Sequence, residues 1–308
     1  MTDPKTQDCD CLIVGGGPAG LTAAIYLARF HLSVMLVDGG ASRAALIPCT
    51  RNHAGFPDGV SGVELLERMR AQAEKYGATL HRGLVSDIAR EGGAFVARTD
   101  VGTFRAKATL LATGVVNRRP EMMADDMHDR ALAQGLLRYC PICDGFEVTD
   151  QRIAVLGTGE RGLKEAIFLR SYSADITLVA PGEGHDLDAG ERARLEEAGI
   201  VLGGICRAMT LEDQHIVLDL DGVPTRFDTL YPALGSEIHS QLAGELGAKL
   251  GDAGCLMVDS HQRTNVPGLY AAGDVVLGLD QISHAMGEGG VAATTIRNDL
   301  AATTPLRR

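Results

Sequence analysis

The chain has 308 residues, of which 45% are hydrophobic and 22% charged, and its formal net charge at pH 7 is −11. This length allows about two domains, and the composition is ordinary for a soluble globular protein. The negative charge argues against a nucleic-acid partner, because phosphate backbones are bound by clustered Lys and Arg. No stretch approaches the roughly 18 apolar residues of a membrane span, and the N-terminus lacks the pattern of a signal peptide. We therefore expect a cytoplasmic protein without membrane contact.

The first predicted unit starts close to the N-terminus. Apolar runs at 10–14 and 33–37 are typical of strands, and 18–30 is typical of a helix between them, which predicts a βαβ unit. A second, amphipathic helix is predicted at 61–76. Its expected apolar face consists of Val63, Leu66, Met69 and Ala73.

A glycine cluster separates the first strand from the first helix. Gly15, Gly17 and Gly20 have the spacing that permits a tight turn, a close approach of a pyrophosphate, and close packing of helix on strand. The helix that begins at Pro18 would offer free N–H groups to phosphates. Asp38 ends the second strand, where a carboxylate can hold an adenosine ribose. The cluster predicts a dinucleotide site.

The pattern restarts in the middle of the chain. Strands are predicted at 152–156 and 175–180, with a helix at 160–172 between them and another near 189–198. The glycine spacing also returns, at Gly157, Gly159 and Gly162. This region is a second βαβ unit, and its glycines are a possible second nucleotide site.

The last section holds one strand, 268–272, and a Gly/Ala-rich helix, 284–300. One strand and one helix are too little for a domain, so we expect them to complete the first unit and leave the middle unit as an insertion. The predicted fold class is α/β, with two Rossmann-like nucleotide-binding domains, the second inserted into the first.

Two of the seven cysteines stand close together, in Cys140-Pro141-Ile142-Cys143-Asp144. In a cytoplasmic protein a C-x-x-C is catalytic or binds metal, and a zinc ribbon needs a second C-x-x-C, which this sequence lacks. We therefore predict a redox pair and no metal site, since C-x-x-C spans one helical turn and brings two sulfurs to disulfide distance. The other cysteines are read as ordinary thiols: Cys9, Cys11, Cys49, Cys206 and Cys255.

These motifs together resemble the low-molecular-weight thioredoxin reductase family of FAD-dependent pyridine nucleotide-disulfide oxidoreductases. The likeness extends over nearly the whole chain. It rests on the segments 15–20 (GGGPAG), 52–57 (NHAGFP), 59–62 (GVSG), 112–114 (ATG), 140–145 (CPICDG) and 268–274 (GLYAAGD). By this resemblance, residues 1–116 and 238–308 form a discontinuous FAD-binding domain, and 117–237 form an NAD(P)-type domain that carries the cysteines.

The resemblance also implies the residues that bind FAD. Gly15, Gly17 and Gly20, with Pro18 and Ala19, would hold the pyrophosphate. Other predicted contacts are Asp38 at the adenosine ribose, Val85 at the adenine, Asn52 at the flavin end, Gly273 and Asp274 at the ribityl chain and phosphate, and the backbone of Gln281 and Ile282 at the isoalloxazine. Gly39, Ala112, Thr113 and Gly114 are further predicted cofactor contacts.

In the family the second cysteine faces the flavin, which assigns Cys143 to the flavin and Cys140 to the substrate. Asp144 would then be the acid/base that protonates the departing thiolate, a role that requires a raised pKa. His284, which with Glu288 lies on the last predicted helix, could carry protons near the dithiol. The alternative reading of His284 as a hydrogen-bonded helix residue is favoured.

The middle domain departs from the family pattern. Members that bind NADPH carry a basic cluster after the second strand of this domain, where Arg grips the 2′-phosphate. Here the segment 179–185 reads VAPGEGH, and the next Arg is Arg192. The sequence therefore leaves NADPH, NADH or no nucleotide open.

The leading function is thioredoxin reductase-like exchange with a thioredoxin-like protein or a small-molecule dithiol or disulfide. The alternatives are a dithiol oxidase that uses oxygen, a reductase fed by ferredoxin or NADH, and a redox-sensing flavoprotein with poor turnover. The family also implies a homodimer.

Overall fold

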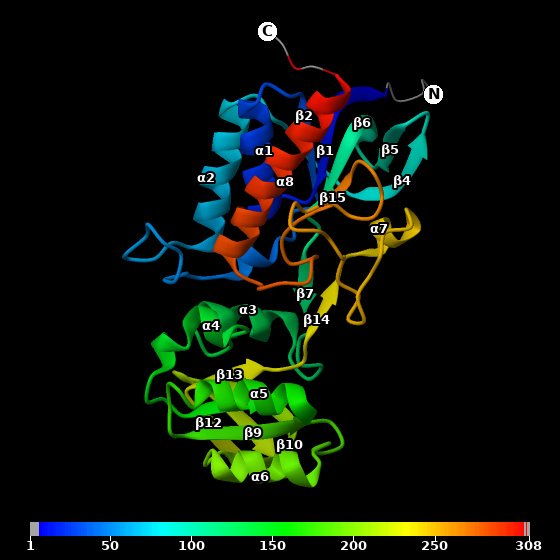
Figure 1. Ribbon diagram of the computed structural model, residues 1–308. Helices are drawn as coiled ribbons and strands as arrows, with labels where there is room; N and C mark the ends of the chain where they lie inside the picture. Colours follow the sequence, from blue (N-terminus) through cyan, green and yellow to red (C-terminus); the bar gives the residue numbers. More distant parts are fainter. Residues whose placement is uncertain (1–5, 305, 307–308) are drawn as a thin grey trace.

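The computed structural model describes residues 6–304 and 306. Two lobes, each built on its own sheet, lie one above the other and are linked by a narrow connection (Figure 1). We call them the first lobe, which contains β1, and the second lobe, which contains β8. The predicted FAD-binding domain begins at residue 1 and ends at residue 308, and both of these residues lie outside the described part of the chain.

The first lobe contains a seven-stranded sheet in which β3, β2, β1 and β6 follow one another in parallel. β6 then pairs antiparallel with β5 through its first half and parallel with β15 through its second half. The strands are β1 (Gln7–Val14), β2 (Val34–Asp38), β3 (Thr79–Arg82), β4 (Val85–Glu91), β5 (Ala94–Thr99), β6 (Gly102–Leu111) and β15 (Leu269–Ala271). The late strand β15 thus returns to the first sheet, as the sequence predicts.

Three helices pack side by side on one face of this sheet (Figure 1): α1 (Pro18–Arg29), α2 (Gly62–Lys75) and α8 (Ile282–Thr303). Their apolar side chains form one core with β1, β2 and β6. A second core fills the opposite face, beneath β4, β5 and α7 (Gln241–Glu245). α8 begins two residues before the predicted start at 284.

The buried face of α2 differs in one residue from the predicted face. Val63 is 50% exposed, and Gly62 instead turns toward the protein, where an added Cβ would lie 1.7 Å from the carbonyl oxygen of Ala44. Leu66, Met69 and Ala73 are buried as expected, and Leu65 is buried as well, although the predicted face did not include it. The interpretation of Val63 was wrong because the chain packs closest at the glycine that begins the helix, and an apolar pattern does not show this contact.

The second lobe contains a six-stranded sheet that lies in the chain between β6 and β15. β13, β8, β9 and β10 are parallel, while β11 and β12 continue antiparallel. The strands are β8 (Ile153–Leu156), β9 (Ile176–Pro181), β10 (Val201–Glu212), β11 (His215–Leu220), β12 (Val223–Phe227) and β13 (Thr229–Pro232). The helices are α3 (Asp125–Ala133), α4 (Pro141–Asp144), α5 (Gly159–Leu169) and α6 (Ala189–Glu197), and the 3₁₀ turns of the chain are η1 (Arg43–Leu46) and η2 (Phe146–Val148).

The two lobes are linked by a short antiparallel ribbon of β7 (Val115–Asn117) and β14 (Ser236–Ile238) (Figure 1). The chain leaves the first lobe through β7 and returns through β14. α3 and α4 lie on the side of the second lobe that faces the first, which brings the cysteine segment toward the first lobe. In the described part of the chain, no helix is long and apolar enough to cross a bilayer.

The contact of α1 with α8 depends on a missing side chain. A Cβ at Gly289 would lie 2.3 Å from the carbonyl oxygen of Ala19. Gly289→Ala is therefore expected to destabilise the protein by about 1–3 kcal/mol, since backbone must move to admit the methyl group. The matched control is Gly287→Ala on the same helix, where an added Cβ meets no heavy atom within 4 Å.

Denaturant unfolding measures both variants. Gly287→Ala should raise the midpoint slightly, because Ala is the better helix former by about 1 kcal/mol. A Gly289→Ala protein as stable as the Gly287→Ala protein would contradict the close contact.

Candidate active site

One cavity of about 750 Å³ lies where the two lobes meet. Its walls include the glycine turn before α1, the end of β2, and the cysteine segment of the second lobe. Nearly all of the predicted FAD and redox residues line it: Gly15, Gly17, Pro18, Ala19, Asp38, Gly39, Asn52, Val85, Ala112, Thr113, Gly114, Cys140, Cys143, Asp144, Gly273, Asp274, Gln281 and Ile282. The structure thus brings together segments that are up to 267 positions apart in the sequence, from Gly15 to Ile282.

The glycine turn has the close backbone packing that the spacing predicts. Gly15 has φ 110°, and a Cβ there would lie 2.2 Å from the carbonyl oxygen of Ala112. Gly20 is buried behind the cavity wall, and its Cβ would lie 2.0 Å from the carbonyl oxygen of Gly15. Gly17 caps α1 without a side-chain hydrogen bond, so the first N–H groups of the helix remain available at the cavity. This uncapped helix end fits a pyrophosphate.

Asp38 lies at the same end of the cavity. Its carboxylate accepts hydrogen bonds from the Arg70 guanidinium at 2.7 Å and from the Gly40 N–H at 2.8 Å. A Cβ on Gly16 would lie 2.4 Å from the carboxylate carbon, so the side chain rests directly against the glycine turn. Arg70 holds Asp38 in this position.

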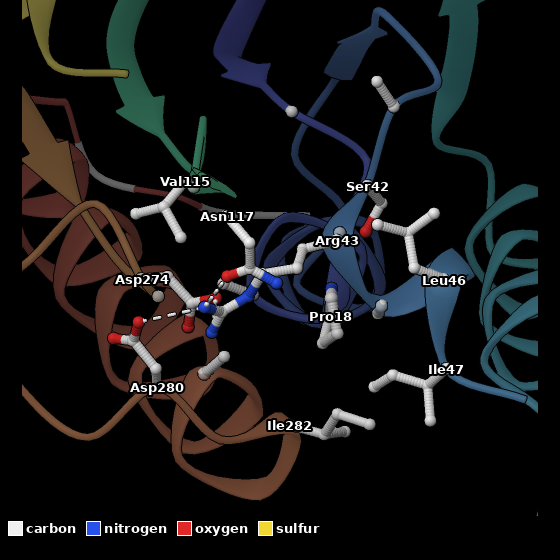
Figure 2. A pocket seen from close by; sticks show the side chains of 18 of the residues that line it. Pro18, Ser42, Arg43, Leu46, Ile47, Val115, Asn117, Asp274, Asp280 and Ile282 are labelled. Carbon is white, nitrogen blue, oxygen red and sulfur yellow. Dashed lines mark hydrogen bonds and ion pairs between the residues drawn. The ribbon is translucent and has the colours of Figure 1, made fainter. Parts of the chain in front are cut away.

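Arg43 forms a polar network across the cavity that the sequence did not reveal (Figure 2). Its guanidinium is 2.8 Å from the Asp274 carboxylate and 3.2 Å from that of Asp280, and it donates to the Asn117 amide oxygen at 3.3 Å. Burial raises the pKa of Asp274, and Arg43 opposes this rise. No glycine or cysteine motif marks Arg43, so its spacing in the sequence gave no signal.

The structure joins Cys140 and Cys143 in a disulfide, with their Cα atoms 5.2 Å apart. Cys140 caps the single turn α4, and its sulfur accepts a hydrogen bond from the Cys143 N–H at 3.2 Å. The disulfide lines the cavity that also contains the glycine turn. A bound cofactor and the two sulfurs would therefore share one space.

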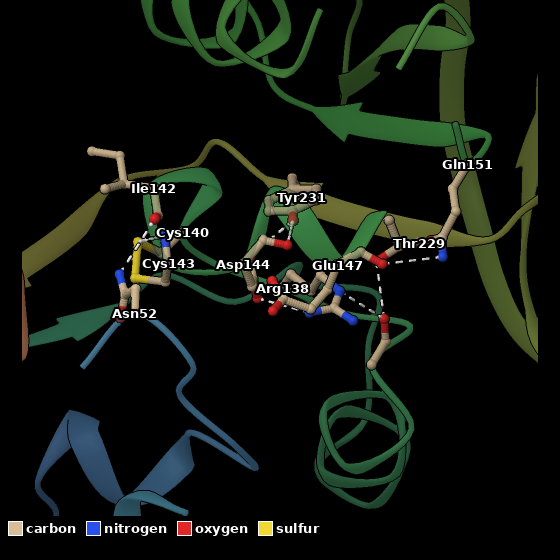
Figure 3. A network of polar contacts seen from close by, with 11 residues as sticks. Asn52, Arg138, Cys140, Ile142, Cys143, Asp144, Glu147, Gln151, Thr229 and Tyr231 are labelled. Carbon is tan, nitrogen blue, oxygen red and sulfur yellow. Dashed lines mark hydrogen bonds and ion pairs between the residues drawn. A yellow bond between two sulfur atoms is a disulfide. The ribbon is translucent and has the colours of Figure 1, made fainter. Parts of the chain in front are cut away.

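Asp144 follows the disulfide and is held by two partners (Figure 3). Its carboxylate accepts from the Tyr231 hydroxyl at 2.8 Å and from the Arg138 guanidinium at 3.0 Å. Burial raises the pKa of Asp144, while Arg138 and then Tyr231 oppose the rise. The direction is the one an acid/base needs. Tyr231 is 87 positions from Asp144 in the sequence, so sequence spacing could not indicate their contact.

Glu165 of α5 adds a second acidic group to this region. One of its carboxylate oxygens is buried and has no hydrogen-bond partner among the described residues. Burial raises the pKa of Glu165 to about 7, Arg161 lowers it, and Asp144 raises it further. Glu165 and Asp144 thus interact electrostatically.

The glycines of the second unit lie outside this cavity. Gly157 precedes α5, Gly159 and Gly162 lie in its first turn, and a Cβ at Gly162 would lie 2.8 Å from the Gly157 carbonyl carbon. After β9, the ring of His185 contacts the Gly203 carbonyl oxygen at 2.9 Å. The exposed Arg192 donates to the Leu187 carbonyl. The glycine turn is closely packed, and residues 179–191 supply no Lys or Arg.

His284 is placed on the first turn of α8, 3.1 Å from the Glu288 carboxylate. Glu288 in turn accepts a hydrogen bond from the Gly273 N–H at 2.7 Å. The side chain of His284 has a structural partner, as the favoured reading expects. In the described residues no three His, Cys, Asp or Glu side chains are arranged to hold a metal ion.

The chain is similar to known proteins over nearly its whole length. A family model described as pyridine nucleotide-disulphide oxidoreductase matches residues 9–289. A thioredoxin reductase of Streptomyces clavuligerus is 33% identical over 94% of this chain and 94% of its own length. Two crystal structures are also similar. That of HlmI has a TM-score of 0.89 at 29% identity, over 97% of this chain and 95% of its own. The structure of a thioredoxin reductase from Streptococcus pyogenes has a TM-score of 0.88 at 26% identity, over 97% of this chain and 100% of its own.

The chain therefore belongs to the pyridine nucleotide-disulphide oxidoreductase family and is an enzyme of the thioredoxin reductase type. The predicted resemblance and the predicted α/β class with two nucleotide-type domains are confirmed. Membership implies FAD and a pyridine nucleotide as cofactors, without determining which nucleotide.

The raised pKa of Glu165 predicts a pH-dependent stability. Between its usual value of 4.5 and about 7, the folded protein retains a proton on Glu165 that the unfolded chain has lost. The free energy of unfolding therefore decreases as pH rises through this window, by at most about 1.4 kcal/mol per unit. Glu165→Gln removes this decrease in the free energy of unfolding. The variant should therefore be more thermostable than the parent at pH 8, with no gain at pH 4.5.

The control is Glu197→Gln, which changes an exposed glutamate of α6. Melting temperatures of the three proteins from pH 4.5 to 8 test the prediction. A gain in Glu165→Gln that is the same at every pH, or a gain shared by Glu197→Gln, would contradict it.

Proposed function

We propose that FAD occupies the cavity between the lobes and exchanges electrons with the Cys140–Cys143 disulfide. This proposal is supported most directly by one observation: the uncapped N-terminus of α1 and the disulfide line the same cavity. The FAD-binding domain would comprise 1–116 and 238–308, and the inserted domain 117–237. Bound FAD supplies the two-electron redox chemistry.

The residues of the chain would divide the work as follows. The Pro18 end of α1 would bind the pyrophosphate, Asp38 the adenosine ribose, and Asp274 the ribityl chain. Within the cysteine pair, Cys143 would face the flavin. Cys140 would form the bond to the sulfur of the external substrate, and break it again when that sulfur is released. Further contacts to FAD would come from Gly15, Gly17, Ala19, Gly20, Gly39, Asn52, Val85, Ala112, Thr113, Gly114, Gly273, Gln281 and Ile282.

Asp144 would protonate the thiolate that departs when a disulfide is opened. A carboxylic acid can donate only while it is protonated, and burial, which raises the pKa of Asp144, favours that state. Tyr231 and Arg138 fix the carboxylate by bonds to opposite oxygens, so its orientation is set before substrate arrives.

The external substrate would be a thioredoxin-like protein or a small-molecule disulfide, since the relatives named above include thioredoxin reductases. We further propose a cytoplasmic homodimer, by the same likeness. Light scattering of the purified holoenzyme measures the dimer directly.

The nucleotide partner is the point at which this chain differs from NADPH-dependent members. Specific NADPH binding requires cations for the 2′-phosphate, and the segment after β9 contains none between residues 179 and 191. The same absence favours a second candidate function, a dithiol oxidase in which electrons enter at the disulfide and leave from FAD to oxygen. Entry of electrons from a donor such as ferredoxin is the further alternative.

An anaerobic titration of the FAD-loaded protein distinguishes these functions. NADPH, NADH and a dithiol are added separately, and flavin absorbance is followed at about 450 nm. We expect the dithiol to bleach the flavin, and NADPH to be no better than NADH. Cys140→Ser should abolish bleaching by the dithiol, because the external thiol then has no disulfide to attack.

Stoichiometric bleaching by NADPH alone would contradict the inferred loss of specificity for the 2′-phosphate. Failure of the dithiol to bleach the wild-type flavin would contradict the proposed function. Admission of air after reduction by dithiol then separates the two candidates, since an oxidase turns over steadily and a reductase reoxidises slowly.

A further inference from the structure

The side chain of Gln281 lies directly on the disulfide. Its amide nitrogen Nε2 is 3.2 Å from Cys140 Sγ and 3.2 Å from Cys143 Sγ. Gln281 precedes α8 in the first lobe, whereas both cysteines belong to the second. The family resemblance predicts a contact of the Gln281 backbone with the flavin and gives its side chain no role.

Two neighbours fix which end of the Gln281 amide faces the sulfurs. Asn52 donates through Nδ2 to Gln281 Oε1 at 3.0 Å and also to the Ile142 carbonyl at 3.3 Å. The Thr50 hydroxyl donates to Asn52 Oδ1 at 2.9 Å, which orients the Asn52 amide in turn. Reversing Gln281 would place its NH₂ group against the NH₂ group of Asn52. Gln281 Oε1 lies 3.7 Å from Cys143 Sγ, farther than Nε2 from either sulfur, so the donor end of Gln281 is the end held closer to the cysteines.

A donor in this position favours one state of the sulfur. Disulfide and thiol sulfurs are weak acceptors, while a thiolate is charged and accepts strongly. A hydrogen bond to the charged form of a group shifts its pKa toward that form. The Gln281 amide therefore stabilises thiolates more than thiols.

We propose that Gln281 is a catalytic residue that donates a hydrogen bond to the reduced cysteines and lowers the pKa of their thiols, with Asn52 as its positioning residue. The inference rests on the proposed redox role of the cysteine pair and deepens it. It assigns to the amide side chain the task of keeping the reduced pair nucleophilic.

The two cysteines should not depend equally on Gln281. Cys140 Sγ also accepts from the Cys143 N–H, at 3.2 Å. For Cys143 Sγ, Gln281 is the hydrogen-bond donor that the described residues provide. Loss of the amide should therefore affect Cys143 more than Cys140.

One carboxylate follows Cys143 in the sequence and another precedes Gln281, and both are held in ion pairs, although Arg43 is shared with Asp274. Asp144 is paired with Arg138 on the side of the second lobe, and Asp280 is paired with Arg43 on the side of the first. Neither ion pair includes Gln281, so the effect of each pair on the thiols is expected to be common to the parent and the variants.

The test is site-resolved alkylation of the reduced holoenzyme without oxygen. The protein is reduced with a phosphine, treated briefly with iodoacetamide from pH 5 to 10, and each cysteine is quantified by mass spectrometry. In Gln281→Leu, we expect the midpoint for Cys143 to rise by about one pH unit, and alkylation below the midpoint to slow roughly tenfold. The midpoint for Cys140 should rise less.

Asn52→Leu is the second variant, and it keeps the amide of Gln281 while removing its support. It should shift Cys143 in the same direction by a smaller amount. Ser283→Ala is the matched control, because Ser283 contacts the His53 ring and neither sulfur in the described hydrogen bonds, and it should shift nothing. Flavin absorbance verifies that each variant is folded and loaded.

Unchanged midpoints in both Gln281→Leu and Asn52→Leu would overturn the proposal. Equal shifts of Cys140 and Cys143, or a shift in Ser283→Ala, would also overturn it, since they would show a general disturbance. The assay reads thiol ionisation without turnover. Failure of electron exchange would instead appear as a flavin that no dithiol bleaches, whatever the alkylation midpoints.

Discussion

The active site depends on contact between the cysteine loop of the second lobe and the cavity of the first. Asn52 and Gln281 reach from the first lobe to the backbone and the sulfurs of that loop. Without this contact, the glycine turn and the disulfide would be separate features of two similar sheets. The covalent link between the lobes at this point is the short β7–β14 ribbon.

Carboxylates that line the cavity between the lobes are held by arginines. Arg43 faces Asp274 and Asp280, Arg70 faces Asp38, and Arg138 faces Asp144. Pairing lowers the cost of moving charges away from water, and it also fixes the orientation of each carboxylate. Glu165 is the contrasting case, since its buried oxygen lacks a hydrogen bond and its pKa is raised to about 7.

Features that depend on local spacing could be predicted from the sequence. The turn at Gly15–Gly20 and the disulfide at Cys140–Cys143 each lie within a few residues, so their geometry is encoded nearby. The return of the last strand to the first sheet could also be predicted, because one strand and one helix are too small to form a domain of their own. Val63 was placed wrongly because an apolar pattern cannot show which residue of a first turn meets the Ala44 backbone.

The partners of the site could not be predicted in the same way. Tyr231 meets Asp144 across 87 positions, and Gln281 meets Cys143 across 138. Neither residue has a spacing that sets it apart from an ordinary core tyrosine or helix-capping glutamine. Such contacts arise from the topology, which brings a strand end or a helix start to the cavity, and they appear when the chain is folded.

The most direct test of the central claim is the number of electrons that the FAD-loaded chain accepts. Anaerobic dithionite titration of wild type should consume two electrons for the flavin and two for the disulfide, both being two-electron couples. Cys143→Ser should consume two, for the flavin alone. Equal consumption by the two proteins would show that the disulfide does not exchange electrons with the flavin and would contradict the account.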